Sequence, residues 1–191
     1  MPSPFFPIQA KNEGVPGSLI DLILGSFALS SSITAPIVGN YLENIGRRRA
    51  FILSLAITGV GIALWGILPY LSYVPFIIIS LIGRLLQGMG YCISLVTGLS
   101  ITASDYSDKT TKVISYMEAS GSTGMIAGPI IGAFTFHFLG FVATFLVYAA
   151  IFFAIIPLFW VMLGPDRPYM KKVQTYKISV CTLSFKGLIF L

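Results

Sequence analysis

The sequence predicts an all-α protein that spans a membrane, built from five transmembrane helices. Of its 191 residues 55% are hydrophobic and 10% are charged, and the mean hydropathy is +0.87. A soluble domain carries about 25% charged residues, so the composition excludes an ordinary soluble enzyme. The apolar runs last for about twenty positions, which is the length that a helix needs to cross ~30 Å of hydrocarbon. Strands of a membrane barrel would instead alternate in polarity over about ten residues.

The five predicted helices follow one another with short breaks. They cover residues 19–38, 50–71, 76–103, 113–136 and 141–163. The breaks are the basic stretch 43–49, the turn 72–75, the polar loop 104–112 and a tight turn near Leu139 and Gly140. The predicted organisation is an N-terminal segment over residues 1–17, a five-helix transmembrane domain over 18–163 and a basic tail over 164–191.

The distribution of basic residues predicts the orientation of these helices. One side of the predicted membrane collects ten of the twelve Lys and Arg residues: Arg47, Arg48, Arg49, Lys109, Lys112, Arg167, Lys171, Lys172, Lys177 and Lys186. Lys and Arg are enriched in short cytoplasmic loops. We therefore expect a cytosolic C-terminus and an N-terminus outside the cell or in an organelle lumen. A vesicle or vacuole membrane and the plasma membrane both fit this multi-pass topology.

Two charged residues inside the predicted spans mark a candidate pathway for substrate and protons. A charge at the bilayer centre costs at least about 2.5–3.5 kcal/mol on insertion scales, so it normally faces a partner or a water-filled cavity. Arg84 is followed at helical spacing by Gln87 and Tyr91, and Glu118 is followed by small residues at steps of three or four. Polar or small residues thus form a stripe on two successive helices, and we expect a polar cavity between them.

A structural role for these charges is the alternative. Arg84 and Glu118 could pair directly and lock two helices together, or Glu118 could lie close enough to the cytosol to be solvated. Depth argues against the pair, because Arg84 lies roughly 12 Å from the outer end of its span and Glu118 roughly 8 Å from the cytosolic end of its own. Asp21, near the outer end of the first span, is a weaker candidate that reaches the interface or pairs with Arg84.

The sequence predicts no catalytic, metal or cofactor site. One His and two distant Cys make no metal-binding set, and no nucleophilic arrangement forms around His137. Trp65, Tyr70 and Tyr73 cluster at one outer boundary, where aromatic residues commonly anchor a helix in the membrane interface. The basic residues stand in short clusters between apolar runs, which does not fit a nucleic-acid-binding surface. We therefore expect neither an enzyme nor a partner of nucleic acid.

A loop with a regular pattern of glycine and charged residues lies between the first two predicted spans. It consists of Gly39, three residues, the acidic Glu43, two residues, Gly46 and the basic pair Arg47 and Arg48. This pattern resembles the loop between the second and third helices of the major facilitator superfamily. The glycines are expected to permit a tight turn at the membrane surface, while the charged residues contact neighbouring helix ends. In that family the loop helps to hold the outward-open state, and the resemblance implies the same here.

Two further segments resemble motifs of the same superfamily. Residues 84–90, which begin with Arg84, are similar to the fourth-helix motif, whose arginine faces the central cavity and is linked to proton coupling. Residues 124–133 are similar to the fifth-helix motif of antiporters, and they contain Gly124, Gly128, Pro129 and Gly132. Small residues at this spacing let another helix approach closely. The proline removes a backbone donor and bends the helix, which makes it a plausible pivot.

The resemblance covers residues 4–163, and it implies that the five spans correspond to helices two to six of the major facilitator fold. Within the superfamily the chain is most similar to vesicular amine and polyamine transporters and drug:proton antiporters. The implied function is transport by alternating access, in which protons and a small organic cation compete for a buried carboxylate. Glu118 is the first candidate for this carboxylate and Asp21 is the second.

Three hypotheses follow for this chain. In the first it is the incomplete N-terminal portion of a proton-coupled antiporter of organic amines or drugs, and its partners are the lipid bilayer, the substrate, protons and the missing helices. In the second it is a truncated relative that does not transport but binds and regulates a full-length transporter. In the third it is a half-size transporter that acts as a homodimer, which an odd number of spans disfavours.

Overall fold

A computed structural model describes residues 6–163 of the chain and gives an all-α membrane fold. The predicted basic tail, residues 164–191, lies outside the described residues, as do residues 1–5 and the side chains of Ile8, Asn12, Glu43 and Ser107. The described elements are α1 (Phe6–Asn12), α2 (Gly17–Ile45), α3 (Arg47–Gly66), η1 (Leu68–Tyr70), α4 (Tyr73–Asp105), η2 (Ser107–Lys109) and α5 (Thr110–Met162).

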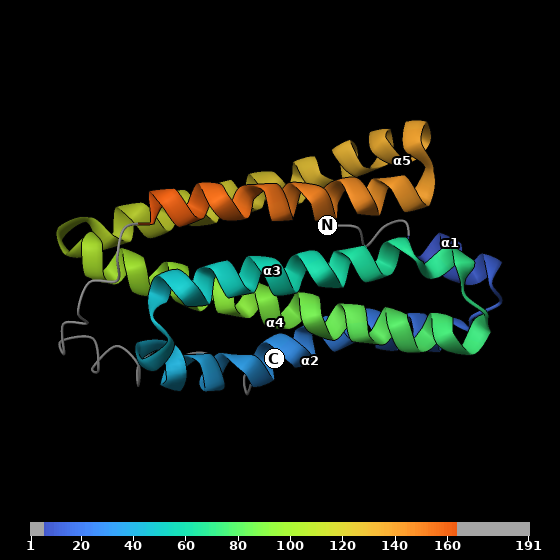
Figure 1. The fold of residues 1–191 in the computed structure, drawn as a ribbon, viewed down its shortest axis with the longest axis horizontal. Coiled ribbons are helices and arrows are strands. Elements are labelled where there is room, and N and C mark those ends of the chain that lie inside the picture. Colours follow the sequence, from blue (N-terminus) through green and yellow to red (C-terminus); the bar gives the residue numbers. More distant parts are fainter. Residues whose placement is uncertain (1–5, 164–191) are drawn as a thin grey trace.

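Four of these helices, α2 to α5, are long and apolar enough to cross a membrane. The fourth, α5, has 53 residues, and a straight helix of that length would extend for about 80 Å. It does not run straight, because Gly140 has φ 76° and ψ 178° and interrupts the helical backbone. Figure 1 shows α5 reversing direction and returning alongside itself. The break expected near Leu139 and Gly140 is therefore confirmed, and the four helices provide five apolar spans.

Helix α4 lies at the centre of the bundle. It packs extensively against α2 and α3, whereas α5 packs mainly against α3 (Figure 1). Close packing is possible because α4 presents glycine to both neighbours. A Cβ atom at Gly88 would lie 2.5 Å from the carbonyl oxygen of Phe27 on α2, and one at Gly90 would lie 2.8 Å from that of Ser54 on α3. Small residues at helix contacts are the usual means of close approach in membranes.

Two helix boundaries differ from those expected, each for a local reason. Helix α2 continues to Ile45, so Gly39 lies inside a helix and only Gly46, with φ 86°, makes the turn into α3. The expectation that Gly39 shapes this turn was wrong. Helix α4 begins at Tyr73 and includes Pro75 in its first turn, where the missing N–H of proline costs no helical hydrogen bond. The predicted turn over residues 72–75 is thus mostly helix.

The N-terminal segment contributes to the core, which the sequence pattern did not indicate. Helix α1 buries Phe6 and Ala10 completely, and both belong to a cluster that includes Trp65, Phe76 and Phe145. These apolar side chains come from α1, α3, α4 and the second arm of α5. The cluster gathers near the end of the bundle that carries α1 and the α3–α4 connection (Figure 1).

Candidate functional site

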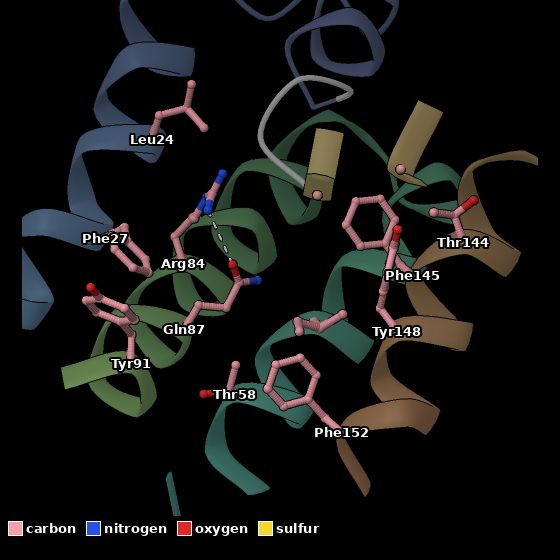
Figure 2. Close-up of a pocket in the computed structure, with 13 residues that line it drawn as sticks. Leu24, Phe27, Thr58, Arg84, Gln87, Tyr91, Thr144, Phe145, Tyr148 and Phe152 are labelled. Carbon is pink, nitrogen blue, oxygen red and sulfur yellow. Dashed lines mark hydrogen bonds between the residues drawn. The ribbon is translucent and has the colours of Figure 1, made fainter. Parts of the chain in front are cut away.

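A cavity of about 360 Å³ lies among α2, α3, α4 and both arms of α5. Its walls are mostly apolar and aromatic, and its polar groups are few. The lining consists of Leu24, Phe27, Thr58, Ile62, Arg84, Gln87, Tyr91, Gly128, Gly132, Thr144, Phe145, Tyr148 and Phe152. Figure 2 shows Arg84 and Gln87 projecting from α4, with Phe27 and Leu24 on one side and the α5 residues on the other. An apolar cavity with a few convergent polar groups is the common form of a small-molecule site.

Arg84 is the charged member of this lining, and Gln87 and Trp65 contact its guanidinium group. Its side chain is 4% exposed, and Nη1 donates a hydrogen bond to Oε1 of Gln87 at 3.3 Å. Its guanidinium carbon lies 4.3 Å from the centroid of the Trp65 ring. Gln87 in turn donates from Nε2 to the carbonyl oxygen of Gly61 at 3.1 Å. Burying a cation in hydrocarbon costs free energy unless the cation has a partner or faces a cavity, and Arg84 faces the cavity.

The aromatic residues form two walls of the cavity. Phe27 of α2 and Tyr91 of α4 lie with their ring centroids 5.6 Å apart, tilted by 43°. The opposite wall comes from the second arm of α5, where Phe145, Tyr148 and Phe152 stand at helical spacing. Aromatic side chains offer large apolar area, and their π faces also attract cations. The cavity can therefore hold a flat apolar body and place polar groups of that body beside Arg84 and Gln87.

The structure brings together part of the predicted pathway. Arg84, Gln87 and Tyr91 line the cavity as one stripe of α4. Glu118 does not join them, because it lies on an exposed part of α5 and is not among the described lining residues. Ten residues separate it from Gly128, which corresponds to about 15 Å along a helix. Asp21 is also exposed, near the start of α2, and stands outside the lining.

The predicted loop motif joins the ends of three helices. Arg47 is 8% exposed and donates from Nη1 to the carbonyl oxygen of Ser100, near the end of α4, at 3.3 Å. Arg48 donates to the carbonyl oxygen of Trp160, near the end of α5, and its guanidinium carbon lies 4.2 Å from the centroid of that indole ring. Helix C-termini carry partial negative charge. Arginines at the start of α3 thus complement the ends of α4 and α5.

The predicted antiporter motif is divided between the cavity and the outer surface. Gly128 and Gly132 line the cavity, and Pro129 lies half-buried between them inside α5. Gly124 is exposed, and a Cβ atom added there would meet no atom within 4 Å. The close helix approach expected along all three glycines is therefore not made at Gly124 by the part of the chain that the structure describes.

Trp65 is the residue of this site that the sequence interpretation missed. It was expected to anchor the membrane interface together with Tyr70 and Tyr73, but it is fully buried, while the two tyrosines are 77% and 44% exposed. Trp65 lies on α3, and its indole ring packs against the guanidinium group of Arg84. The available signal was a glycine at position 83, because a side chain there would collide with the indole ring.

Comparison with known proteins identifies the family of this chain. The family model of the Major Facilitator Superfamily matches residues 1–179. The chain is 28% identical to the MFS-type transporter SLC18B1 of Homo sapiens over 156 residues, which are 81% of this chain and 34% of that protein. It is 28% identical to multidrug resistance protein 2 of Bacillus subtilis (strain 168) over 153 residues, 79% of this chain and 35% of the relative.

A third relative is the quinolone resistance protein NorA of Staphylococcus aureus (strain MRSA252), which is 29% identical over 133 residues, 69% of this chain and 32% of that protein. The chain thus spans about a third of the length of the curated relatives that it matches. The family match covers nearly the whole sequence and agrees with the apolar helices and the buried cavity arginine. This chain belongs to the major facilitator superfamily of membrane transporters.

Proposed function

We propose that the chain is the N-terminal portion of a proton-coupled antiporter that moves organic amines, other organic cations or drugs by alternating access. The observation that carries the proposal is a buried arginine in an aromatic cavity inside a major facilitator protein. Arg84 stands on the central helix α4, and the cavity that it lines reaches the walls of α2, α3 and α5. Two of the relatives are named for multidrug and quinolone resistance, which supports a drug-like substrate.

The size and chemistry of the cavity support a small organic substrate. Its volume of about 360 Å³ lies in the range of roughly 300–1,000 Å³ that is typical of ligand pockets. Phe27, Tyr91 and Phe152 offer aromatic surface to a planar or cationic group. In alternating-access transporters such a site lies near the bilayer midplane and opens to each side in turn.

The proposed proton step involves a carboxylate, and Glu118 remains the first candidate, followed by Asp21. Glu118 is exposed on α5, although a carboxylate within hydrocarbon needs a partner or water. We infer that Glu118 faces helices of the transporter that lie beyond this chain. Coupling would then arise when protons and a cationic substrate compete for this carboxylate, while Arg84 sets the charge of the cavity.

The proposed orientation places the Arg47–Arg49 end of the bundle in the cytosol. That end also carries Lys109 and Lys112, whereas Lys11 lies on α1 at the other end. The N-terminus then faces the outside or an organelle lumen, and a vesicle, vacuole or plasma membrane would supply the pH difference. Lipid, protons and the substrate are the proposed partners.

The second candidate is a relative that does not transport but binds a full-length transporter and regulates it. It is favoured by the exposed first arm of α5, where Met125, Ile126, Ile130 and Phe134 are each at least 65% exposed. In the first proposal this apolar surface meets the helices of the same polypeptide. In the second it meets a separate transporter.

Two measurements test the proposal in sequence. Mass spectrometry of membrane fractions, with peptides mapped to both ends, gives the length of the endogenous polypeptide. That polypeptide is then reconstituted into vesicles with an acidic interior, and uptake of ethidium, a fluorescent planar cation, is recorded. Uptake that collapses with the pH gradient is expected. A polypeptide that shows no gradient-driven uptake, yet co-purifies with a full-length transporter, would favour the second candidate.

A further inference from the structure

An aromatic column links the N-terminal helix to the cavity arginine. The Phe6 and Trp65 rings stack with centroids 4.5 Å apart and an interplanar angle of 26°. The Arg84 guanidinium carbon lies 4.3 Å from the centroid of the same indole ring. Three helices, α1, α3 and α4, therefore contribute one residue each to a continuous stack that ends at the cavity.

The indole ring of Trp65 has little freedom to move. It is fully buried, and its Nε1–H donates to the carbonyl oxygen of Ser80 on α4 at 3.1 Å. A Cβ atom at Gly83 would lie 2.6 Å from its Cδ1 atom. Glycine immediately before Arg84 thus lets the ring lie against the backbone of α4. Trp65 is fixed both by a hydrogen bond and by the shape of the helix that carries the arginine.

The guanidinium is also tied back to α3 through a side chain of its own helix. Arg84 donates to Gln87, and Gln87 donates to the carbonyl oxygen of Gly61. Gly61 lies one helical turn before Trp65, so the indole contact and the link through Gln87 come from the same segment of α3. Binding groups work when their neighbours hold them to within about 0.5 Å of the productive position. The indole ring and the Gln87 side chain restrain the guanidinium from two directions.

Phe6 extends the support to the other side of the indole. It is fully buried and stacks on Phe76 as well, with centroids 6.0 Å apart. Trp65 also contacts Phe145, whose ring centroid lies 5.8 Å away and which lines the cavity from α5. A shift of α1 would therefore free space beside Trp65 and loosen the ring on which Arg84 rests.

We propose that Trp65 is the positioning residue of Arg84 and that Phe6 of α1 holds Trp65 in place. The inference rests on the proposed function in one respect, which is that Arg84 contacts the substrate. Its structural content is separate: the π face of Trp65, and not merely its bulk, keeps the guanidinium directed into the cavity. The short helix α1 is then part of the support of the binding site.

Substitution of Trp65 separates the π face from the bulk. Trp65→Phe retains an aromatic face, whereas Trp65→Leu retains an apolar side chain without one. The purified chain in detergent is treated with p-hydroxyphenylglyoxal, and modification of each arginine is followed by peptide mass spectrometry. A desolvated cation–π contact corresponds to about 2 kcal/mol, or a factor of roughly 30. Loss of most of this contact in Trp65→Leu should raise the rate of Arg84 modification by at least about tenfold. Trp65→Phe, which keeps an aromatic face, should change that rate by about threefold or less.

Arg49 provides the internal control, because it is exposed and should react equally in every variant. Equal modification of Arg84 in the Leu and Phe variants would overturn the proposal. If Trp65→Leu does not fold, the Phe6→Leu variant is measured instead. It is made in a Trp160→Phe background, so that Trp65 is the single tryptophan and its fluorescence can be followed. Increased acrylamide quenching of Trp65 together with increased Arg84 modification is then expected. Unchanged values for both would contradict the support by α1.

Binding of ethidium distinguishes this inference from the proposed function. If the wild-type chain binds ethidium, we expect Trp65→Leu to weaken binding by at least about tenfold and Trp65→Phe to retain it within about threefold. Equal affinity in the two variants would overturn the positioning role while leaving the proposed function standing. Absence of binding to the wild type would count against the proposed function, and arginine modification would still decide the role of Trp65.

Discussion

The hydroxyl group of Ser30 on α2 donates a hydrogen bond to the backbone carbonyl oxygen of Leu85 on α4 at 2.7 Å. The contact lies beside the cavity, one residue after Arg84 along the chain. Ser26 and Thr34 are also buried, one helical turn on either side of Ser30. A stripe of small hydroxyl side chains thus forms the surface of α2 that meets α4, which is the usual way in which membrane helices pack closely. This contact fixes α2 relative to the arginine helix.

Gly88→Ala should destabilise the α2–α4 contact. The added Cβ atom would lie 2.5 Å from the carbonyl oxygen of Phe27, and a backbone atom cannot move aside without shifting the helix. Overpacking of this kind costs about 1–3 kcal/mol, so a lower midpoint of thermal unfolding in detergent is expected. Gly25→Ala is the matched control, because nothing lies within 4 Å of its added Cβ. Equal midpoints for the two variants would contradict the close packing.

Gly140→Ala should destabilise the reversal between the two arms of α5. Gly140 has φ 76° and ψ 178°, a conformation that is essentially confined to glycine and costs other residues about 1–3 kcal/mol. We expect a lower unfolding midpoint and easier proteolysis between the arms. Gly124→Ala, on the same helix in helical conformation with open space around it, should leave both properties unchanged. A variant at 140 that behaves like the one at 124 would exclude a strained turn.

The sequence predicted the spans well because long apolar runs, and glycines at the breaks between them, are local signals. The reversal at Gly140 is an example, because the glycine and the spacing of the apolar runs were enough to predict a turn there. The helix ends were predicted less well. Helix α2 runs on to Ile45 through a stretch that contains Asn40, Glu43 and Asn44. Hydropathy does not register the continuation of a helix into polar residues.

The sequence predicted which site residues share a face of one helix, but not which helices pack together around the site. Arg84, Gln87 and Tyr91 share a face of α4 by periodicity alone, and they do line one cavity. Glu118 was paired with this cavity because its own helix carries a similar stripe, yet periodicity does not say which neighbour a stripe meets. Trp65 was assigned to the interface from its neighbours in sequence, whereas burial depends on contacts with Phe6 and Arg84 that join distant segments.

Arg48→Lys should weaken the junction between the start of α3 and the end of α5. Lysine keeps the charge but lacks the planar group that stacks on Trp160 and donates to its carbonyl oxygen. Cation–π contacts at exposed sites contribute about 0.5–1 kcal/mol. A small fall in the unfolding midpoint is expected, together with a shift of Trp160 emission in a Trp65→Phe background. Arg49→Lys, at an exposed neighbouring position, should cause neither change.

Pro129→Leu should alter conformational switching more than folding. Pro129 lies inside α5 between two glycines that line the cavity, and proline bends a helix by removing a hydrogen bond and crowding the preceding turn. Leucine restores the hydrogen bond and stiffens the helix there. We expect a slower rate of substrate exchange by the endogenous-length polypeptide, with an unfolding midpoint that is unchanged or higher. Exchange at the wild-type rate would argue against a pivot at this position.

Arg84→Ala should abolish gradient-driven uptake by the endogenous-length polypeptide without preventing membrane insertion. Removal of the guanidinium takes the charge out of the cavity and leaves Gln87 without that donor, while the apolar walls that drive insertion remain. Insertion is verified by resistance of the membrane fraction to carbonate extraction, and uptake of ethidium into acidic vesicles gives the activity. Arg84→Lys tests geometry, because it keeps a positive charge but cannot lie flat against the Trp65 ring as the guanidinium does. If the lysine variant transports as well as wild type, charge alone suffices at this position, and if the alanine variant does so, the cavity arginine has no part in coupling.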